Sequence, residues 1–236
     1  MTVTAETTTA GPPQSRLVQV RTKILKENDV VARALRESFR EAGVYVVSLV
    51  SSPGAGKTTF LEKTLLLLRD QLRVAALVGD LATDNDARRL ARAEVPVKQI
   101  TTGTTCHLEA EMVRTALAGW NLRDLDLLFI ENVGNLVCPA SYDLGENLRL
   151  VLFSVTEGED KPLKYPTIFN TADLAVITKT DLSEAAEFDD AAARQNIQTV
   201  RPGMPIFGVS AKGGEGMSEW LALVGSRVAE SRRTAP

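Results

Sequence analysis

The sequence predicts an α/β fold with a mostly parallel central sheet of about seven strands and helices on both faces. Short apolar runs alternate along the chain with stretches of helical apolar spacing, which is typical of βαβ units. The runs are rich in Val, Ile and Leu without clean alternation, as expected of strands covered on both faces. A length of 236 residues with 44% hydrophobic residues suits one large domain.

The apolar pattern places the expected elements in order along the chain. Strands are expected over 45–51, 73–79, 97–101, 125–130, 149–155, 174–178 and 204–209, and helices over 57–69, 84–93, 108–118, 184–200 and 217–230. Two further helices are expected at 17–25 and 30–39, with a break and a new N-cap at Asn28-Asp29. Residues 1–16 are rich in Thr, Pro and Ala and are expected to be a disordered tail, which leaves 17–236 as one domain whose first part, 17–42, holds the N-terminal helices.

Charge and composition exclude several classes of partner. With 27 Lys+Arg against 30 Asp+Glu, the net charge of -3 argues against a protein that chiefly binds nucleic acid or an anionic membrane. No run of eighteen or more apolar residues occurs, so no membrane span is predicted. The N-terminus carries no basic-then-apolar signal pattern, and a cytoplasmic location with reduced cysteines is expected.

A predicted strand leads directly into a Gly-rich loop and then a helix, which is the context of a Walker A phosphate loop. Ser51 stands where the strict pattern has Gly, but the Gly-Lys-Thr end is present. Glycines let backbone N–H groups converge on phosphate oxygens, and the helix N-terminus adds a favourable dipole. Lys57 is expected to reach the β- and γ-phosphates, and the Thr58 hydroxyl to bind Mg²⁺. The predicted nucleotide-binding residues here are Gly54, Ala55, Gly56, Lys57, Thr58 and Thr59.

Acidic residues follow two of the predicted strands, at the sheet edge where nucleotides bind. Asp80 and Glu131 are predicted to complete the Mg²⁺ site with Thr58. Asp84 and Asp86 follow Asp80 in a possible switch segment, although Asp84 is equally well explained as a helix N-cap. The predicted catalytic residues are Lys57, Asp80, Asp86 and Glu131, and the residues leave open whether Asp80 or Asp86 orients the attacking water.

Two later loops predict that the base is guanine. An Asp carboxylate after a strand can accept the N1–H and N2–H donors of guanine, whereas adenine has no such donor pair on that edge. The expected base-binding residues are Lys179, Asp181, Ser210, Ala211 and Lys212, with Thr178 where GTPases usually have Asn. A small-molecule kinase on the same fold is an alternative, but it needs an Arg-rich lid. Arg88-Arg89 is too little for one and is interpreted as a solvated helix face.

The two cysteines and the single histidine lie in two short segments, Cys106-His107 and Cys138. Two thiolates and an imidazole suit Zn²⁺, Ni²⁺ or Cu, and three protein ligands leave a position open for exchange. The plainer alternatives are buried, inert cysteines or a structural zinc module with a vestigial phosphate loop. Cys138 comes a few residues after Glu131, so the hypothesis is that GTP and GDP states hold the metal differently.

Four segments together carry a resemblance to a known family: 80–87, 106–110, 131–140 and 157–166. Over about residues 17–230 the chain resembles the HypB family, the nickel-incorporation GTPases of nickel–iron hydrogenase maturation. The resemblance implies a dimeric P-loop GTPase of the SIMIBI class that hydrolyses GTP, with nickel as cargo at a site of Cys106, His107 and Cys138 in the dimer interface. It also implies other maturation factors and the hydrogenase large subunit as partners.

The chain departs from the family in its first residues. Some members carry an N-terminal cysteine motif or a His-rich tract, and residues 1–16 have neither Cys nor His. Tight N-terminal nickel binding and nickel storage are therefore not expected. A urease-type nickel-insertion GTPase is a related alternative, but its metal loop resembles Cys-Pro-His, and here no Pro separates Cys106 from His107.

Overall fold

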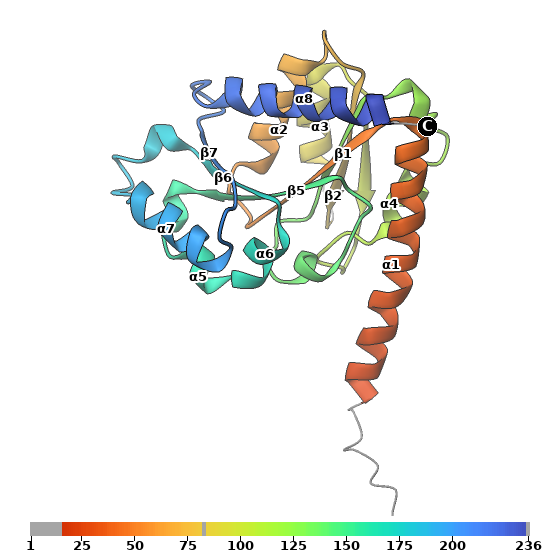
Figure 1. The fold of residues 1–236 in the computed structure, drawn as a ribbon, viewed down its shortest axis with the longest axis horizontal. Coiled ribbons are helices and arrows are strands. Elements are labelled where there is room, and N and C mark those ends of the chain that lie inside the picture. Colours follow the sequence, from red (N-terminus) through yellow and green to blue (C-terminus); the bar gives the residue numbers. More distant parts are fainter. Residues whose placement is uncertain (1–15, 82–83, 235–236) are drawn as a thin grey trace, which may run out of the picture.

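The computed structural model describes residues 16–81 and 84–234, and its centre is a seven-stranded sheet in the order β3-β2-β4-β1-β5-β6-β7 (Figure 1). Every neighbouring pair of strands runs parallel. The predicted fold class is thereby confirmed, and the observed strands lie within one or two residues of the expected ones. They are β1 (Tyr45–Ser51), β2 (Val74–Asp80), β3 (Val97–Thr101), β4 (Leu127–Glu131), β5 (Leu148–Ser154), β6 (Leu174–Thr178) and β7 (Ile206–Val209).

Helices cover both faces of this sheet, as Figure 1 shows. On one face lie α2 (Lys57–Leu68), α3 (Asn85–Leu90) and α8 (Met217–Thr234), where Phe60, Leu65 and Trp220 pack on the sheet. The other face is covered by α1 (Arg16–Ala42) and α4 (Ala110–Ala116) and, toward β7, by α6 (Pro166–Thr171) and α7 (Asp190–Val200), next to the short α5 (Lys161–Lys164). The strands are apolar throughout because both of their surfaces are buried.

The prediction of two N-terminal helices is wrong, because α1 runs unbroken through Asn28 and Asp29. The Asn28 side chain does not cap its own helix. It is buried, its Nδ2 donates to the Asp143 carbonyl at 2.8 Å, and its Oδ1 accepts from the Ala110 backbone N–H at 2.8 Å. Asn28 thus holds the first turn of α4 against α1. The tail expected over residues 1–16 lies outside the described residues, apart from Arg16, which begins α1.

Asn28→Ala will lower the free energy of unfolding by about 2 kcal/mol, because it leaves the Ala110 N–H and the Asp143 carbonyl without their buried partner. Urea unfolding followed by circular dichroism measures this. An unchanged midpoint would show that water replaces both bonds at no cost.

Some of the predicted helix bounds are also wrong. The helix expected over 184–200 begins only at Asp190, because the Asp189 side chain accepts from the Ala192 N–H at 2.9 Å and Glu187 has a positive φ of 49°. The helix expected over 84–93 ends at Leu90 and continues as a 3-10 turn, Ala91–Ala93. The pattern did not predict α5 and α6, which are too short to show helical periodicity. No helix in the described part of the chain is long and apolar enough to cross a bilayer.

Candidate functional site: a phosphate loop beside a cysteine and histidine cluster

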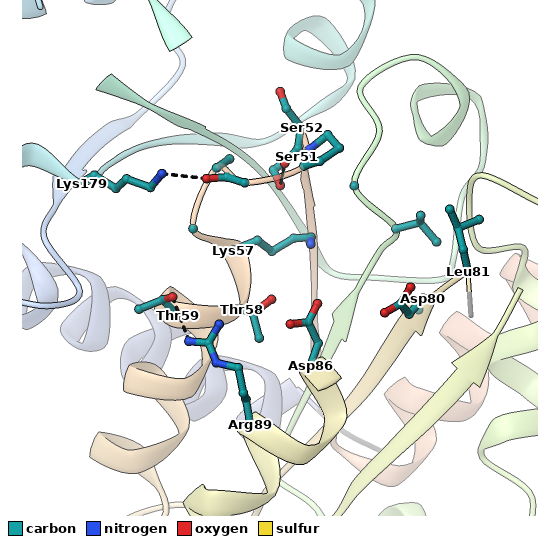
Figure 2. A pocket seen from close by; sticks show the side chains of 17 residues that line it. Ser51, Ser52, Lys57, Thr58, Thr59, Asp80, Leu81, Asp86, Arg89 and Lys179 are labelled. Atoms are coloured by element: carbon teal, nitrogen blue, oxygen red, sulfur yellow. Dashed lines mark hydrogen bonds between the residues drawn. The ribbon is translucent and has the colours of Figure 1, made fainter. Parts of the chain in front are cut away.

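The Gly-rich loop between β1 and α2 lines a cavity of about 540 Å³ at the carboxyl ends of β1 and β2 (Figure 2). Gly54 and Gly56 have φ values of 76° and 90°, which L side chains rarely adopt, so the loop needs glycine at both positions. Gly56 precedes the first turn of α2, and the free N–H groups of that turn give a phosphate its natural site. Most of the predicted phosphate-side residues line the cavity: Gly54, Ala55, Gly56, Lys57, Thr58, Thr59, Asp80 and Asp86.

Glu131, the acid at the end of β4, binds the two central side chains of the loop. One carboxylate oxygen lies 2.9 Å from the Lys57 ammonium and 2.7 Å from the Thr58 hydroxyl. The residue is 1% exposed, and its second oxygen has no hydrogen-bond partner among the described residues. A buried carboxylate oxygen beside a Thr hydroxyl suits Mg²⁺, a hard cation that prefers oxygen ligands. Glu131 does not line the cavity itself, but it pairs with Lys57, which does.

The acids after β2 separate into two groups. Asp80 and Asp86 both line the cavity (Figure 2), so the geometry leaves the choice of water-orienting residue between them. Asp84 instead pairs with Arg88 at 2.8 Å, both well exposed, and its side chain makes no capping hydrogen bond among the described residues. Residues 82–83 of the possible switch segment lie outside the described residues.

Arg89 does not have the solvated position expected for it. Its guanidinium donates to the Thr59 hydroxyl and to Glu62, each at 3.0 Å, and it lines the phosphate cavity. Arg88 does lie at the surface, 75% exposed. The two arginines are neighbours on one short helix, and nothing in the sequence indicates that Arg89 lines the cavity while Arg88 is exposed.

The residues predicted to bind the base lie around a second cavity of about 240 Å³, which shares Gly56, Thr59 and Lys179 with the first. Ser210 donates to the Asp181 carboxylate at 2.7 Å and holds that side chain in place. Asp181, Ala211 and Lys212 line the cavity, and Ser210 lies behind Asp181. The structure therefore brings the predicted guanine-reading residues to the side of the phosphate loop.

Thr178 and Lys179 join β6 to the phosphate loop. The Thr178 hydroxyl donates to the Ala55 carbonyl at 2.5 Å. The Lys179 ammonium donates to the Gly54 carbonyl at 2.7 Å, as the dashed line from Lys179 in Figure 2 shows. A hydroxyl thus makes the contact between the predicted base site and the phosphate loop, at the position where GTPases usually have the amide of Asn. This departure leaves the neighbouring Asp181 in position.

Cys138 lies beside Cys106 and His107, although 32 positions separate the two cysteines in the chain. The two sulfurs lie 3.0 Å apart, and one ligand atom from each of the three residues lies within 4.8 Å of the others. Cys138 begins a 3-10 turn, Cys138–Ser141, while Cys106 and His107 lie between β3 and α4. Two sulfurs and an imidazole nitrogen at this separation can bind one soft or borderline metal ion.

The His107 ring is prepared for ligation by burial. It packs on the Tyr142 ring with centroids 3.9 Å apart, and Nε2 lies 3.4 Å from a Glu109 oxygen without hydrogen-bond geometry. Both ring nitrogens lack a hydrogen-bond partner among the described residues. Burial lowers the pKa of His107, although Glu109 acts in the opposite direction. The lowered pKa favours the neutral imidazole, which is the form that binds a metal. The hydrogen bond with Cys106, together with burial, raises the pKa of Cys138, so a metal must displace its proton.

Two asparagines that sequence reasoning missed connect the phosphate loop and the metal cluster. Asn132 Oδ1 accepts from the Leu108 N–H at 3.0 Å, and Asn135 Nδ2 donates to the Cys106 carbonyl at 3.2 Å. Gly134 packs on the phosphate loop so closely that an added Cβ would meet Pro53 Cα at 3.0 Å. The segment 131–138 therefore contacts both sites.

The sheet, the loop and its buried acid define a P-loop nucleotide-binding protein with a cysteine and histidine cluster beside the nucleotide cavity. A family model described as "CobW/HypB/UreG, nucleotide-binding domain" matches residues 45–208. The chain belongs to the HypB family within this group, since it also covers most of several HypB proteins at high identity.

Three similar proteins illustrate this. Hydrogenase maturation factor HypB of Azotobacter chroococcum mcd 1 is 49% identical, over 91% of this chain and 70% of the relative. Hydrogenase/urease maturation factor HypB of Helicobacter hepaticus is 45% identical, over 86% of this chain and 84% of the relative. The crystal structure of HypB from Helicobacter pylori in complex with nickel superposes with a TM-score of 0.82 at 41% identity, covering 87% of this chain and 97% of that chain.

Proposed function

We propose that this chain is a GTP-hydrolysing metallochaperone that binds nickel and delivers it during nickel–iron hydrogenase maturation, in the cytoplasm. Nickel binding and release are proposed to be coupled to the nucleotide state and to dimerisation, so that nickel affinity differs between the GTP and GDP states. The observation that carries the proposal is that one segment, 131–138, contacts the phosphate loop at one end and supplies a metal ligand at the other. The names of the relatives and the nickel complex of the Helicobacter pylori protein support the choice of metal and pathway.

The proposed chemistry is hydrolysis of GTP to GDP and phosphate. Lys57 and the backbone N–H groups of the loop would bind the β- and γ-phosphates, and Asp80 or Asp86 would orient the attacking water. Thr58, Asp80 and Glu131 would hold Mg²⁺, which neutralises phosphate charge when bound. Without an arginine supplied by a partner, P-loop GTPases turn over on the order of 10⁻⁴ to 10⁻² per second, so hydrolysis would act as a slow switch.

Asp181→Asn tests the choice of base. Guanine N1–H and N2–H would then face an amide donor, so GTP affinity should fall by at least about 100-fold. Xanthosine triphosphate, which has a carbonyl at C2, should bind the variant better than GTP does. Competition binding with GTP, ATP and xanthosine triphosphate measures both effects.

The matched control is Ser210→Ala, which removes the hydroxyl that holds Asp181 but keeps the carboxylate. Ser210→Ala should lower the affinity for GTP without changing the order in which the protein prefers the three nucleotides. Equal binding of ATP and GTP by the unaltered protein would contradict the proposal.

The metal is proposed to be nickel, with zinc as the competing occupant, because both accept two thiolates and an imidazole. The three ligands leave at least one coordination position for a partner. We propose that a second copy of the chain supplies it in a nucleotide-linked homodimer, and that other maturation factors and the hydrogenase large subunit receive the metal. Because one relative carries a hydrogenase/urease name, urease is a second candidate recipient.

A further inference from the structure

We propose that Asn132 is a positioning residue that transmits the occupancy of the phosphate loop to the metal cluster. This inference rests on the proposed function, in which nucleotide state changes metal affinity. It assigns that coupling to one buried side chain and one backbone N–H group, Leu108 N–H.

Asn132 lies between the two sites and is 1% exposed. Its backbone N–H donates to the Leu49 carbonyl at 3.0 Å, which fixes it to β1, the strand that leads into the phosphate loop. Its Oδ1 accepts from the Leu108 N–H at 3.0 Å and from the Val133 N–H at 2.9 Å. Leu108 directly follows His107, so Asn132 holds the backbone of a metal ligand.

The residue before Asn132 contacts the phosphate loop. Glu131 binds the Lys57 ammonium and the Thr58 hydroxyl, the two groups that phosphate and Mg²⁺ would bind. The Glu131 carboxylate, which is 1% exposed, would then exchange these two partners for Mg²⁺. A buried carboxylate must keep a partner, so Glu131 would shift with this exchange, and the adjoining peptide would shift with it.

Leu108 is well placed to pass on this displacement. It is fully buried, and a Cβ added at Gly79 would lie 2.8 Å from its side chain. Gly79 precedes Asp80 at the end of β2, so the Leu108 side chain packs against one acid-bearing strand, while its N–H donates to the side chain of Asn132, the residue that follows the other acid-bearing strand, β4. Packed side chains of this kind shift between discrete arrangements rather than deform continuously.

The chain offers a matched control for this role. Asn28 is buried and accepts from the Ala110 N–H at 2.8 Å, so it anchors the same segment of chain two residues further on. It does so from α1, which makes no hydrogen bond to the phosphate loop among the described residues. Asn28→Ala therefore loosens the segment without touching the route from Glu131.

The experiment compares nickel affinity with GDP and with a non-hydrolysable GTP analogue, by equilibrium dialysis, for the unaltered protein, Asn132→Ala and Asn28→Ala. The quantity of interest is the ratio of the two nickel affinities, one measured with GDP and one with the GTP analogue. Coupling between sites typically changes affinity by about 5- to 150-fold, and a ratio in that range is expected for the unaltered protein and for Asn28→Ala. For Asn132→Ala the ratio should fall to within about twofold of one, while GDP affinity stays within about threefold of the unaltered value. Asn132→Ser, whose hydroxyl is too short to reach the Leu108 N–H, should behave like Asn132→Ala and serves if the first variant does not fold.

Failure of the inference and failure of the proposed function give different results in this experiment. If the unaltered protein shows a ratio but Asn132→Ala keeps it, Asn132 does not transmit the signal and the proposed function stands. If Asn132→Ala and Asn28→Ala lose the ratio equally, the segment needs only general anchoring, and the inference is overturned. A ratio of one in the unaltered protein overturns the coupling in the proposed function and this inference with it.

Discussion

Lys57→Ala will reduce GTP hydrolysis by at least about 100-fold, because it removes the ammonium that stabilises charge on the transferred phosphoryl group. The same change leaves Glu131, which is 1% exposed, without the cation it pairs with at 2.9 Å. Removing one partner of a buried ion pair costs about 3 kcal/mol of stability, so the variant will also unfold more easily. Phosphate release under single-turnover conditions measures the first effect, and urea unfolding the second.

The double variant Lys57→Ala with Glu131→Gln separates these two effects. The amide keeps the shape of Glu131 but carries no charge, so stability should return toward that of the unaltered protein while hydrolysis stays lost. Full recovery of hydrolysis in the double variant would show that Lys57 acts only by neutralising Glu131, and that the phosphate role assigned to it is wrong.

Cys138→Ser will lower nickel affinity by at least about 100-fold, because a hydroxyl is a far poorer ligand than a thiolate for this class of metal ion. Nickel titration in the presence of a competing chelator measures the loss. GDP affinity should stay within about threefold, since the Cys138 side chain makes no hydrogen bond with the phosphate loop among the described residues.

Val137→Ala is the matched control for Cys138→Ser. Val137 is 66% exposed and offers no ligand atom, so its truncation should leave nickel affinity unchanged. If Cys138→Ser binds nickel as tightly as the unaltered protein, the cluster is not the nickel site, and its close sulfur pair has another role.

Much of the fold and most of the candidate site could be predicted from the sequence. The strands were predictable because apolar residues buried on both faces leave a continuous pattern, as at 45–51 and 174–178. The phosphate loop was predictable because all of its parts are close together in the sequence: glycines that allow its backbone conformation, followed directly by the Lys-Thr pair. Cys106, His107 and Cys138 were rare residue types in a chain with one histidine, so their chemistry alone singled them out.

Other features depend on contacts between distant segments, which no local pattern records. Asn28 reads as a cap for its own helix, yet its side chain satisfies a backbone group far along the chain, at Ala110. Arg89 looks like its neighbour Arg88, and only the packing of α3 beside α2 directs it to Thr59. Asn132 carries no signal of its own, because its role is set by the Leu108 N–H that tertiary folding brings to it.

If segment 131–138 couples the nucleotide site to the metal site, nickel affinity must depend on the bound nucleotide, and nickel equilibrium dialysis on the purified protein measures this dependence. Samples with GDP and with a non-hydrolysable GTP analogue are compared side by side. We expect nickel bound near one per chain or one per dimer, with an affinity that differs between the two nucleotides by about fivefold or more. Equal affinity in both states, or no nickel retained in either, would contradict it.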